Sequence, residues 1–159
     1  MIVYHGSSEI VKNPDIIHSY HALDFGCGFY VTSNEEQAVT WAKRKAVYRG
    51  VKYGILNCYE MKDDMYGFKV KTFAPDLNEW LDFVCACREG QTIFEKFDLI
   101  TGKVADDKVF RVVEKYRSGD WERGRALKEI RAYPNYDQTA FISQRSIDQL
   151  LTFREFREI

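Results

Sequence analysis

The sequence predicts an α+β fold, built as one domain over residues 1–159. Segments with the two-residue alternation of strands are interspersed with segments that repeat at the 3.6-residue spacing of helices. A chain of 159 residues and 18.7 kDa is long enough to bury one apolar core and short for two. Its 3 prolines and 10 glycines are scattered, and no repeat, low-complexity stretch or linker divides the chain.

Two strands and a helix are predicted in the first third of the chain. Ile2 to His5 and Gly28 to Thr32 have the composition of short strands. The Ser-Asn-Glu-Glu sequence from Ser33 to Glu36 then has the pattern of a capping box, in which two side chains satisfy free backbone groups at a helix start. This pattern predicts a helix through about Tyr48.

The middle of the chain predicts a hairpin, a helix and a further strand. Tyr53 to Met61 and Phe68 to Phe73 look like paired strands, because turn residues separate them. A helix that ends before Gly90 follows, since apolar residues recur there at helical spacing. These residues are Leu77, Trp80, Leu81 and Val84. The next strand, Phe97 to Thr101, ends at Gly102.

The last third predicts two consecutive helices, a strand, a short helix and a final strand. One apolar stripe ends at Gly119 and the other before Pro134. The stripes consist of Val109, Val112, Val113 and Tyr116, and of Ala126, Leu127, Ile130 and Tyr133. A strand at Gln138 to Ile142 and a short helix from Gln144 follow. The final strand is predicted from an alternation of its apolar residues, which are Leu151, Phe153 and Phe156.

Composition favours a soluble, cytoplasmic protein without a membrane partner. Hydrophobic residues make up 45% and charged residues 30% of the chain, and no apolar run approaches the roughly 20 residues of a membrane span. Met1 leads directly into the first strand-like segment, with no basic leader or apolar signal core before it. A formal net charge of −1 lacks the broad positive field on which non-specific nucleic-acid binding relies.

The cysteines and histidines do not predict a metal site. No Cys-x-x-Cys spacing is present, and His18 and His21 have no evident third ligand. We therefore expect no metal, and we expect the cysteines to be reduced structural thiols. They are Cys27, Cys58, Cys85 and Cys87.

Short segments of histidine, glycine and aromatic residues carry the functional information. The chain opens with Tyr4-His5-Gly6-Ser7, and the second strand carries Gly26-Cys27-Gly28-Phe29-Tyr30. Trp41 follows Tyr30 after ten intervening residues, and Asp137-Gln138 lies near the end. Each fragment alone is common, so their order and spacing carry the argument.

This arrangement resembles the ADP-ribosyltransferase superfamily, in its diphtheria-toxin and poly(ADP-ribose) polymerase branch. The His-Tyr-Glu signature of that branch here reads His5, Tyr30 and Gln138. The resemblance implies a split core of two packed, mainly antiparallel β-sheets with flanking helices, and NAD as the donor of ADP-ribose. The chain also resembles a bacterial family of uncharacterised proteins grouped with these transferases. The segments that recur there are Trp80-Leu81-Asp82-Phe83-Val84, Val104-Ala105-Asp106-Asp107 and Gln138-x-x-Phe141.

The resemblance implies a role for each residue of the first two motifs. The backbone of Gly6 would bond the nicotinamide carboxamide, and a glycine lets a ligand approach the main chain closely. His5 would bond the adenosine-side ribose, with Ser7 beside it. Tyr30 and Trp41 would hold the nicotinamide between their rings. The alternatives are a half-buried structural histidine for His5 and core packing for the two aromatic residues.

Gln138 stands where the family usually carries glutamate, and would touch the hydroxyls of the reacting ribose. Because a neutral amide offers no negative charge to an oxocarbenium-like state, we expect lower turnover than with glutamate, and no polymer synthesis. The Glu-x-Glu sequence of arginine-modifying toxins is missing, and Ala38 replaces the serine with which the polymerases bond the carboxamide. The alternative for Gln138 is an exposed strand residue.

Four charged residues are candidates for acceptor recognition or auxiliary catalysis. Asp82 and Arg88 lie six apart on a predicted helix, and Asp106 and Asp107 precede another. Helix capping or surface ion pairing is the competing explanation.

The sequence therefore predicts an NAD-dependent mono-ADP-ribosyltransferase that modifies a protein or nucleic-acid acceptor, as a toxin-like effector. An antitoxin-like or regulatory protein is a further candidate partner. One alternative is a degenerate module that binds NAD, ADP-ribose or a partner protein without transfer. Another is an NAD-dependent RNA 2′-phosphotransferase, which shares the superfamily fold.

Overall fold

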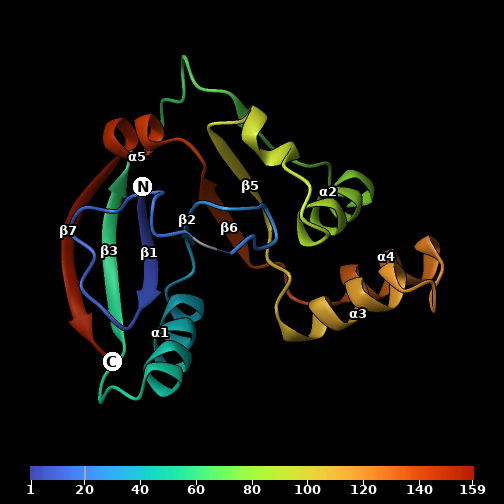
Figure 1. The fold of residues 1–159 in the computed structure, drawn as a ribbon, viewed down its shortest axis with the longest axis horizontal. Coiled ribbons are helices and arrows are strands. Elements are labelled where there is room, and N and C mark those ends of the chain that lie inside the picture. The colour runs from blue at the N-terminus through green and yellow to red at the C-terminus, as the bar shows by residue number, and fades with distance from the viewer. Residues whose placement is uncertain (20) are drawn as a thin grey trace.

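The computed structural model describes residues 1–19 and 21–159 (Figure 1). Strands and helices are interspersed along the chain, as the sequence predicts. In chain order they are β1 (Ile2–Ser7), β2 (Phe29–Val31), α1 (Glu35–Arg49), β3 (Ile55–Met61), β4 (Val70–Lys71), α2 (Asn78–Arg88), the 3₁₀ helix η1 (Ile93–Lys96), β5 (Leu99–Lys103), α3 (Asp107–Arg117), α4 (Arg123–Ala132), β6 (Asp137–Phe141), α5 (Gln144–Leu150) and β7 (Leu151–Glu158).

Within the described ranges the strands form two sheets, and the α+β class is confirmed. The three-stranded sheet has the order β1-β3-β7 and is antiparallel throughout. The four-stranded sheet has the order β2-β6-β5-β4 and is antiparallel except for the β4-β5 pair. A bridge joins β1 to the chain after β2, where Tyr4 N donates to Thr32 O at 2.8 Å and Thr32 N to Tyr4 O at 3.0 Å. Figure 1 shows the two sheets side by side, with β1 next to β2.

The predicted hairpin between the third and fourth strands is wrong. β3 pairs with β1 and β7, while β4 pairs in parallel with β5 in the other sheet. Burial explains the difference, because nearly every residue of β3 is buried, as suits the central strand of a sheet. β4 is a two-residue edge strand in which Val70 is 40% exposed. The turn residues at 62–67 therefore lead the chain from one sheet to the other rather than back along β3.

The final strand contains a bulge, and the spacing of its apolar residues fits this bulge. In the pairing of β3 with β7, Tyr59 lies opposite Phe153 and Asn57 opposite Phe156, with a shift of register between them. A bulged strand gains one residue, so positions three apart face the same side. The three-residue step from Phe153 to Phe156 matches this bulge and would break the alternation of a regular strand.

Helix α1 begins one residue later than the capping-box pattern predicts. Asn34 is the N-cap, and its side chain accepts a hydrogen bond from Gln37 N at 2.9 Å. Ser33 is held elsewhere, because its backbone N donates to Asp137 Oδ2 at 3.1 Å and its hydroxyl bonds the same carboxylate. The helix ends at Gly50, which has the positive φ of 67° that favours glycine.

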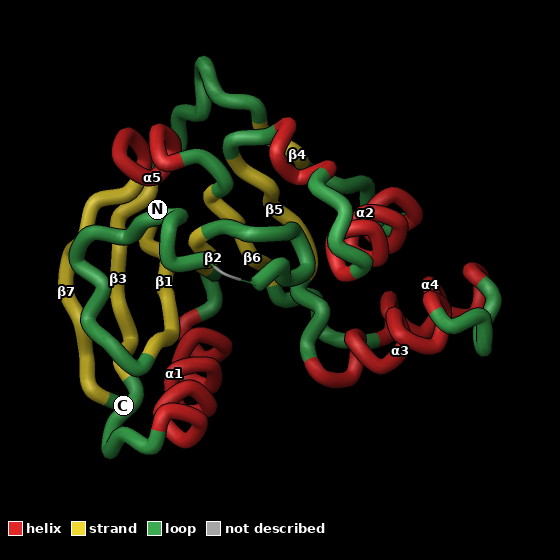
Figure 2. Tube along the Cα trace, viewed as in Figure 1, coloured by secondary structure: helices red, strands yellow, loops and turns green. Residues whose placement is uncertain are grey.

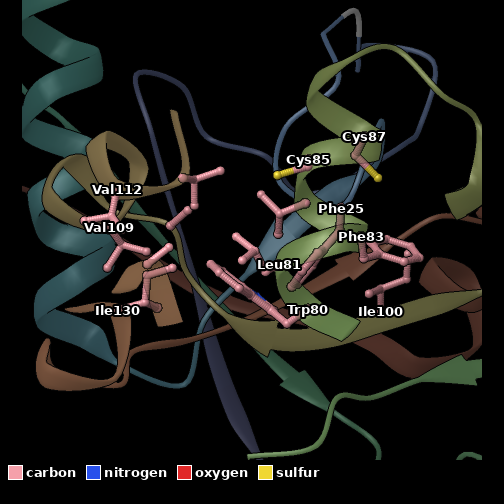
Figure 3. Packing of buried hydrophobic residues seen from close by; sticks show 14 of the residues in the cluster. Phe25, Trp80, Leu81, Phe83, Cys85, Cys87, Ile100, Val109, Val112 and Ile130 are labelled. Atoms are coloured by element: carbon pink, nitrogen blue, oxygen red, sulfur yellow. The ribbon is translucent and has the colours of Figure 1, made fainter. Parts of the chain in front are cut away.

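The largest apolar cluster lies between the four-stranded sheet and helices α2, α3 and α4, which Figure 2 shows on one side of that sheet. Trp80, Phe25 and Ile100 are fully buried in it (Figure 3). The indole Nε1 of Trp80 donates to Lys103 O at 2.9 Å, so its polar group is satisfied. The cysteines are free, as predicted, and burial raises the pKa of the Cys85 thiol to about 11.

Candidate functional site

His5 connects β1 and β2, the two strands that carry the histidine and glycine motifs. Its Nδ1 lies 2.7 Å from Tyr30 O, and because a carbonyl oxygen only accepts, Nδ1 carries the proton. The ring also packs against Phe29, with ring centroids 4.5 Å apart. Burial lowers the pKa of His5 to about 4, so the imidazole is neutral near pH 7. Its Nε2 then presents a lone pair, which suits a hydroxyl donor from a ligand.

Gly6 lies at the point where the two sheets part. Tyr4 directs its N–H and C=O toward Thr32, and in an antiparallel strand the backbone groups two residues further point to the same edge. Gly6 therefore directs its N–H and C=O to the edge from which β2 turns away. A side chain would not fit here, since a Cβ would lie 2.1 Å from Ala38 O and 3.0 Å from Trp41 Cβ. The backbone of Gly6 thus packs closely on the turn of α1 that carries Ala38 and Trp41, and this packing is sufficient reason for the glycine.

Tyr30 contributes its backbone to the site and its ring to the core. The phenol donates to Gly26 O at 2.7 Å and accepts from Phe25 N at 3.0 Å. Only 7% of the residue is exposed, and burial raises the pKa of the phenol well above its usual value. The structure therefore places the Tyr30 ring in the largest apolar cluster and leaves its carbonyl to hold His5.

Gln138 belongs to a buried polar network around Asp24, a residue that the sequence analysis missed. Gln138 Nε2 donates to Asp24 Oδ2 at 2.9 Å, and Ala105 N donates to the same oxygen at 2.9 Å. Arg88 Nε donates to Asp24 Oδ1 at 3.1 Å, and its NH2 group bonds that oxygen too. The Arg88 guanidinium also lies 4.4 Å from the centre of the Phe110 ring. Gln138 and Asp24 are each 4% exposed, so the exposed-strand alternative for Gln138 is wrong.

The network fixes the orientation of the Gln138 amide. Asp24 accepts the amide hydrogen, so the other end of the amide, Oε1, is an acceptor that bonds none of the described residues. Across residues 1–19 and 21–159, Gln37 alone has side-chain polar atoms that are both sealed from solvent and unpaired. The Gln138 oxygen therefore keeps contact with solvent. A hint of Asp24 in the sequence is its position between apolar residues, as in Leu23-Asp24-Phe25, directly before the glycine motif.

Trp41 lines a cavity of about 190 Å³ between α1 and the ends of β5 and β6. Asp106 lines the same cavity, and its side chain also caps α3 by accepting from Val109 N at 3.1 Å. His5, Gly6, Tyr30 and Gln138 are not part of this lining. The lining residues are Asn34, Glu36, Gln37, Thr40, Trp41, Arg44, Val104, Asp106 and Tyr136.

The remaining predicted residues do not converge on one point. Asp82 is exposed and pairs with Arg123, so it does not meet Arg88. Asp107 pairs with Arg44 of α1 at 2.9 Å, also at the surface.

Ser7 adjoins His5 along β1 and is buried. Its hydroxyl accepts a hydrogen bond from Glu9 N at 3.3 Å, which fixes the turn after the strand.

The comparison with known families gives one assignment. The chain matches the family model described as "Protein of unknown function (DUF3990)" over residues 1–153. The chain belongs to the DUF3990 family. Neither the curated proteins nor the solved structures contain a match.

A second and larger cavity of this DUF3990 chain, of about 560 Å³, contains none of the predicted site residues. It lies at the opposite ends of β5 and β6 from Trp41, and its wall includes Lys69, Lys96 and Arg145. Arg145 is engaged there, with Asp98 at 3.4 Å and the Phe68 ring 4.3 Å away.

Outside position 20, no group of three or more histidine, cysteine, aspartate or glutamate side chains is arranged to hold a metal ion. Over the same residues, no helix is both long and apolar enough to cross a membrane.

Proposed function

We propose that this chain is an NAD-dependent mono-ADP-ribosyltransferase that acts on a protein or nucleic-acid acceptor. The observation that carries the proposal is the hydrogen bond from His5 Nδ1 to Tyr30 O. This bond joins the two motifs on which the resemblance rests, at the edge where the sheets part. The N–H and C=O groups of Gly6 point to the same edge. The packed sheets and flanking helices are compatible with the expected core.

The chemistry would use groups that the fold already orients. Neutral His5 would accept a hydrogen bond from a ribose hydroxyl at Nε2, and the Gly6 backbone would bond the carboxamide of the nicotinamide. Gln138 Oε1 would accept from a hydroxyl of the reacting ribose. The bond between nicotinamide and ribose breaks, nicotinamide leaves with the bonding electrons, and the acceptor forms the new bond to the ribose and loses a proton.

Asp24 would act through Gln138 as a positioning residue. Its carboxylate supplies the acceptor that holds the Gln138 amide, but Arg88 lies against it and offsets its negative charge. Little negative potential then reaches the developing oxocarbenium ion, so low intrinsic turnover is the expectation. This neutralisation also favours the second candidate function, a module that binds NAD or ADP-ribose without transferring it.

Release of nicotinamide from NAD, followed by chromatography, tests the proposal. Wild-type protein is compared with His5→Ala and with His18→Ala, a matched histidine substitution in the connection between β1 and β2. We expect release that falls at least tenfold in His5→Ala and stays unchanged in His18→Ala. Binding of NAD without release would favour the binding module, and an absence of both binding and release would refute the NAD-based function.

A further inference from the structure

Gln37 lines the Trp41 cavity, and its side-chain amide is buried with neither of its polar atoms paired. Both Oε1 and Nε2 are sealed from solvent, and among the described residues neither has a hydrogen-bond partner. A buried amide without partners is costly, so such a group calls for a ligand or an ordered water. Gln37 also lines the cavity of about 190 Å³, so a turn of its side chain toward this space would bring the amide within reach of a ligand group.

Helix capping does not account for Gln37. A glutamine at the third helical position usually bonds back to the N–H of the N-cap residue. Here the N-cap is Asn34, and its N–H donates instead to Thr32 Oγ1 at 3.0 Å. The capping bond from Gln37 N to Asn34 Oδ1 uses only the Gln37 backbone. Thr32 therefore accepts the hydrogen bond that the Gln37 side chain would accept in a capping box, and the Gln37 amide does not take part in the cap.

The chemistry of the cavity wall selects the ligand group. An amide with one free donor edge and one free acceptor pairs best with another amide, through two antiparallel hydrogen bonds. The Trp41 side chain lines the same cavity and suits a planar ring. Glu36 and Asp106 disfavour an anion, and the one cation among the lining residues, Arg44, is paired with Asp107.

We propose that Gln37 reads the carboxamide of a nicotinamide ring that enters the Trp41 cavity, and that it selects NAD over its carboxylate analogue. The inference rests on the proposed function and names the recognition group at that site. Gly6 packs on the turn of α1 that carries Trp41, since a Cβ added to Gly6 would lie 3.0 Å from Trp41 Cβ. A carboxylate in place of the carboxamide has no N–H, which would leave Gln37 Oε1 buried and unpaired.

Dissociation constants for NAD and for nicotinic acid adenine dinucleotide, measured by calorimetry, test the inference. Wild-type protein is compared with Gln37→Met, which keeps the side-chain volume without donor or acceptor, and with Gln91→Ala as an exposed control. We expect wild type and the control to prefer NAD by about tenfold or more, and the Gln37→Met preference to fall below about threefold. Circular dichroism verifies that each variant is folded.

The outcomes separate the two proposals. If wild type binds NAD and Gln37→Met keeps the full preference, Gln37 does not read the carboxamide, while the proposed function stands. If wild type binds both dinucleotides equally, the inference is also overturned. If wild type binds neither dinucleotide, the proposed function itself fails and the inference falls with it.

Discussion

Replacing Gln138 with glutamate tests the buried network most sharply. Resemblance alone would lead one to expect that the family's glutamate improves the enzyme. The structure predicts a large loss of stability instead, because the introduced carboxylate would face Asp24 across the 2.9 Å that now separates Gln138 Nε2 from Asp24 Oδ2. A favourable hydrogen bond becomes a contact between like charges.

The size of the loss follows from two competing costs. Two unit charges at this separation repel by about 6 kcal/mol at an effective dielectric constant near 20. Protonating a carboxyl of ordinary pKa at pH 7 costs about 4 kcal/mol, and the protonated group can donate to Asp24 as the amide does. The cheaper route prevails, so we expect Gln138→Glu to lose about 4 kcal/mol at pH 7. This is a large part of the 5–15 kcal/mol typical of a domain.

The protonation route also fixes the sign of the pH dependence. The introduced glutamate would have a folded pKa above its unfolded value, so the folded variant would bind a proton that the unfolded chain releases. Stability relative to wild type should rise by about 1.4 kcal/mol per pH unit as the pH falls from 7 toward about 5. Urea unfolding, followed by fluorescence of the buried Trp80 and the other tryptophans, measures both effects.

Exchanging the two groups provides the control. Asp24→Asn combined with Gln138→Glu returns one carboxylate and one amide to the network, with Arg88 still facing it. We expect the double variant to be more stable than the sum of the single variants predicts, by at least about 2 kcal/mol. A Gln138→Glu variant as stable as wild type at pH 7, or one with no pH dependence, would refute the reasoning. Turnover with glutamate is best compared in the double variant.

Three further predictions concern stability. Gly6→Ala should lose roughly 3 kcal/mol by urea unfolding, because its Cβ would lie 2.1 Å from Ala38 O and displace α1; an unchanged midpoint would contradict that packing. His5 has a folded pKa of about 4 against 6.5 unfolded, so its contribution, at most roughly 3 kcal/mol, should be present above pH 6.5 and lost as the pH falls to about 4; His5→Gln should remove that part of the pH profile. Arg44→Ala should change the unfolding free energy by less than about 0.5 kcal/mol, since both partners of its pair with Asp107 are exposed; a loss above about 1 kcal/mol would disprove this.

The sequence predicts the elements well because their signals are local. The stripe that contains Val109 and Val112 becomes α3, whose buried face meets the largest cluster. Gly50 and Gly119, which follow the last turns of α1 and α3, have positive φ values of 67° and 85°. Spacing and stop signals act within one or two turns of helix, so the sequence alone carries them.

What the sequence could not predict depends on long-range partners. The pairing of β3 with β7 joins residues about a hundred positions apart, and no local pattern distinguishes it from a hairpin. Asp24 acquires its role from Gln138, which lies 114 residues further along the chain, and from Arg88. The Gln37 side chain is left unpaired because Thr32 Oγ1 accepts the hydrogen bond from Asn34 N. Either side chain could accept from this N–H, and the sequence does not show which one does.

The most direct test of the central claim follows the two halves of NAD separately. Purified protein is incubated with cell lysate and with NAD labelled either in the adenine or in the nicotinamide ring, beside His5→Ala. The account predicts that the adenine label becomes attached to a macromolecule, that the nicotinamide label appears as free nicotinamide, and that both depend on His5. Labelled NAD recovered intact, with neither label transferred nor released, would contradict it.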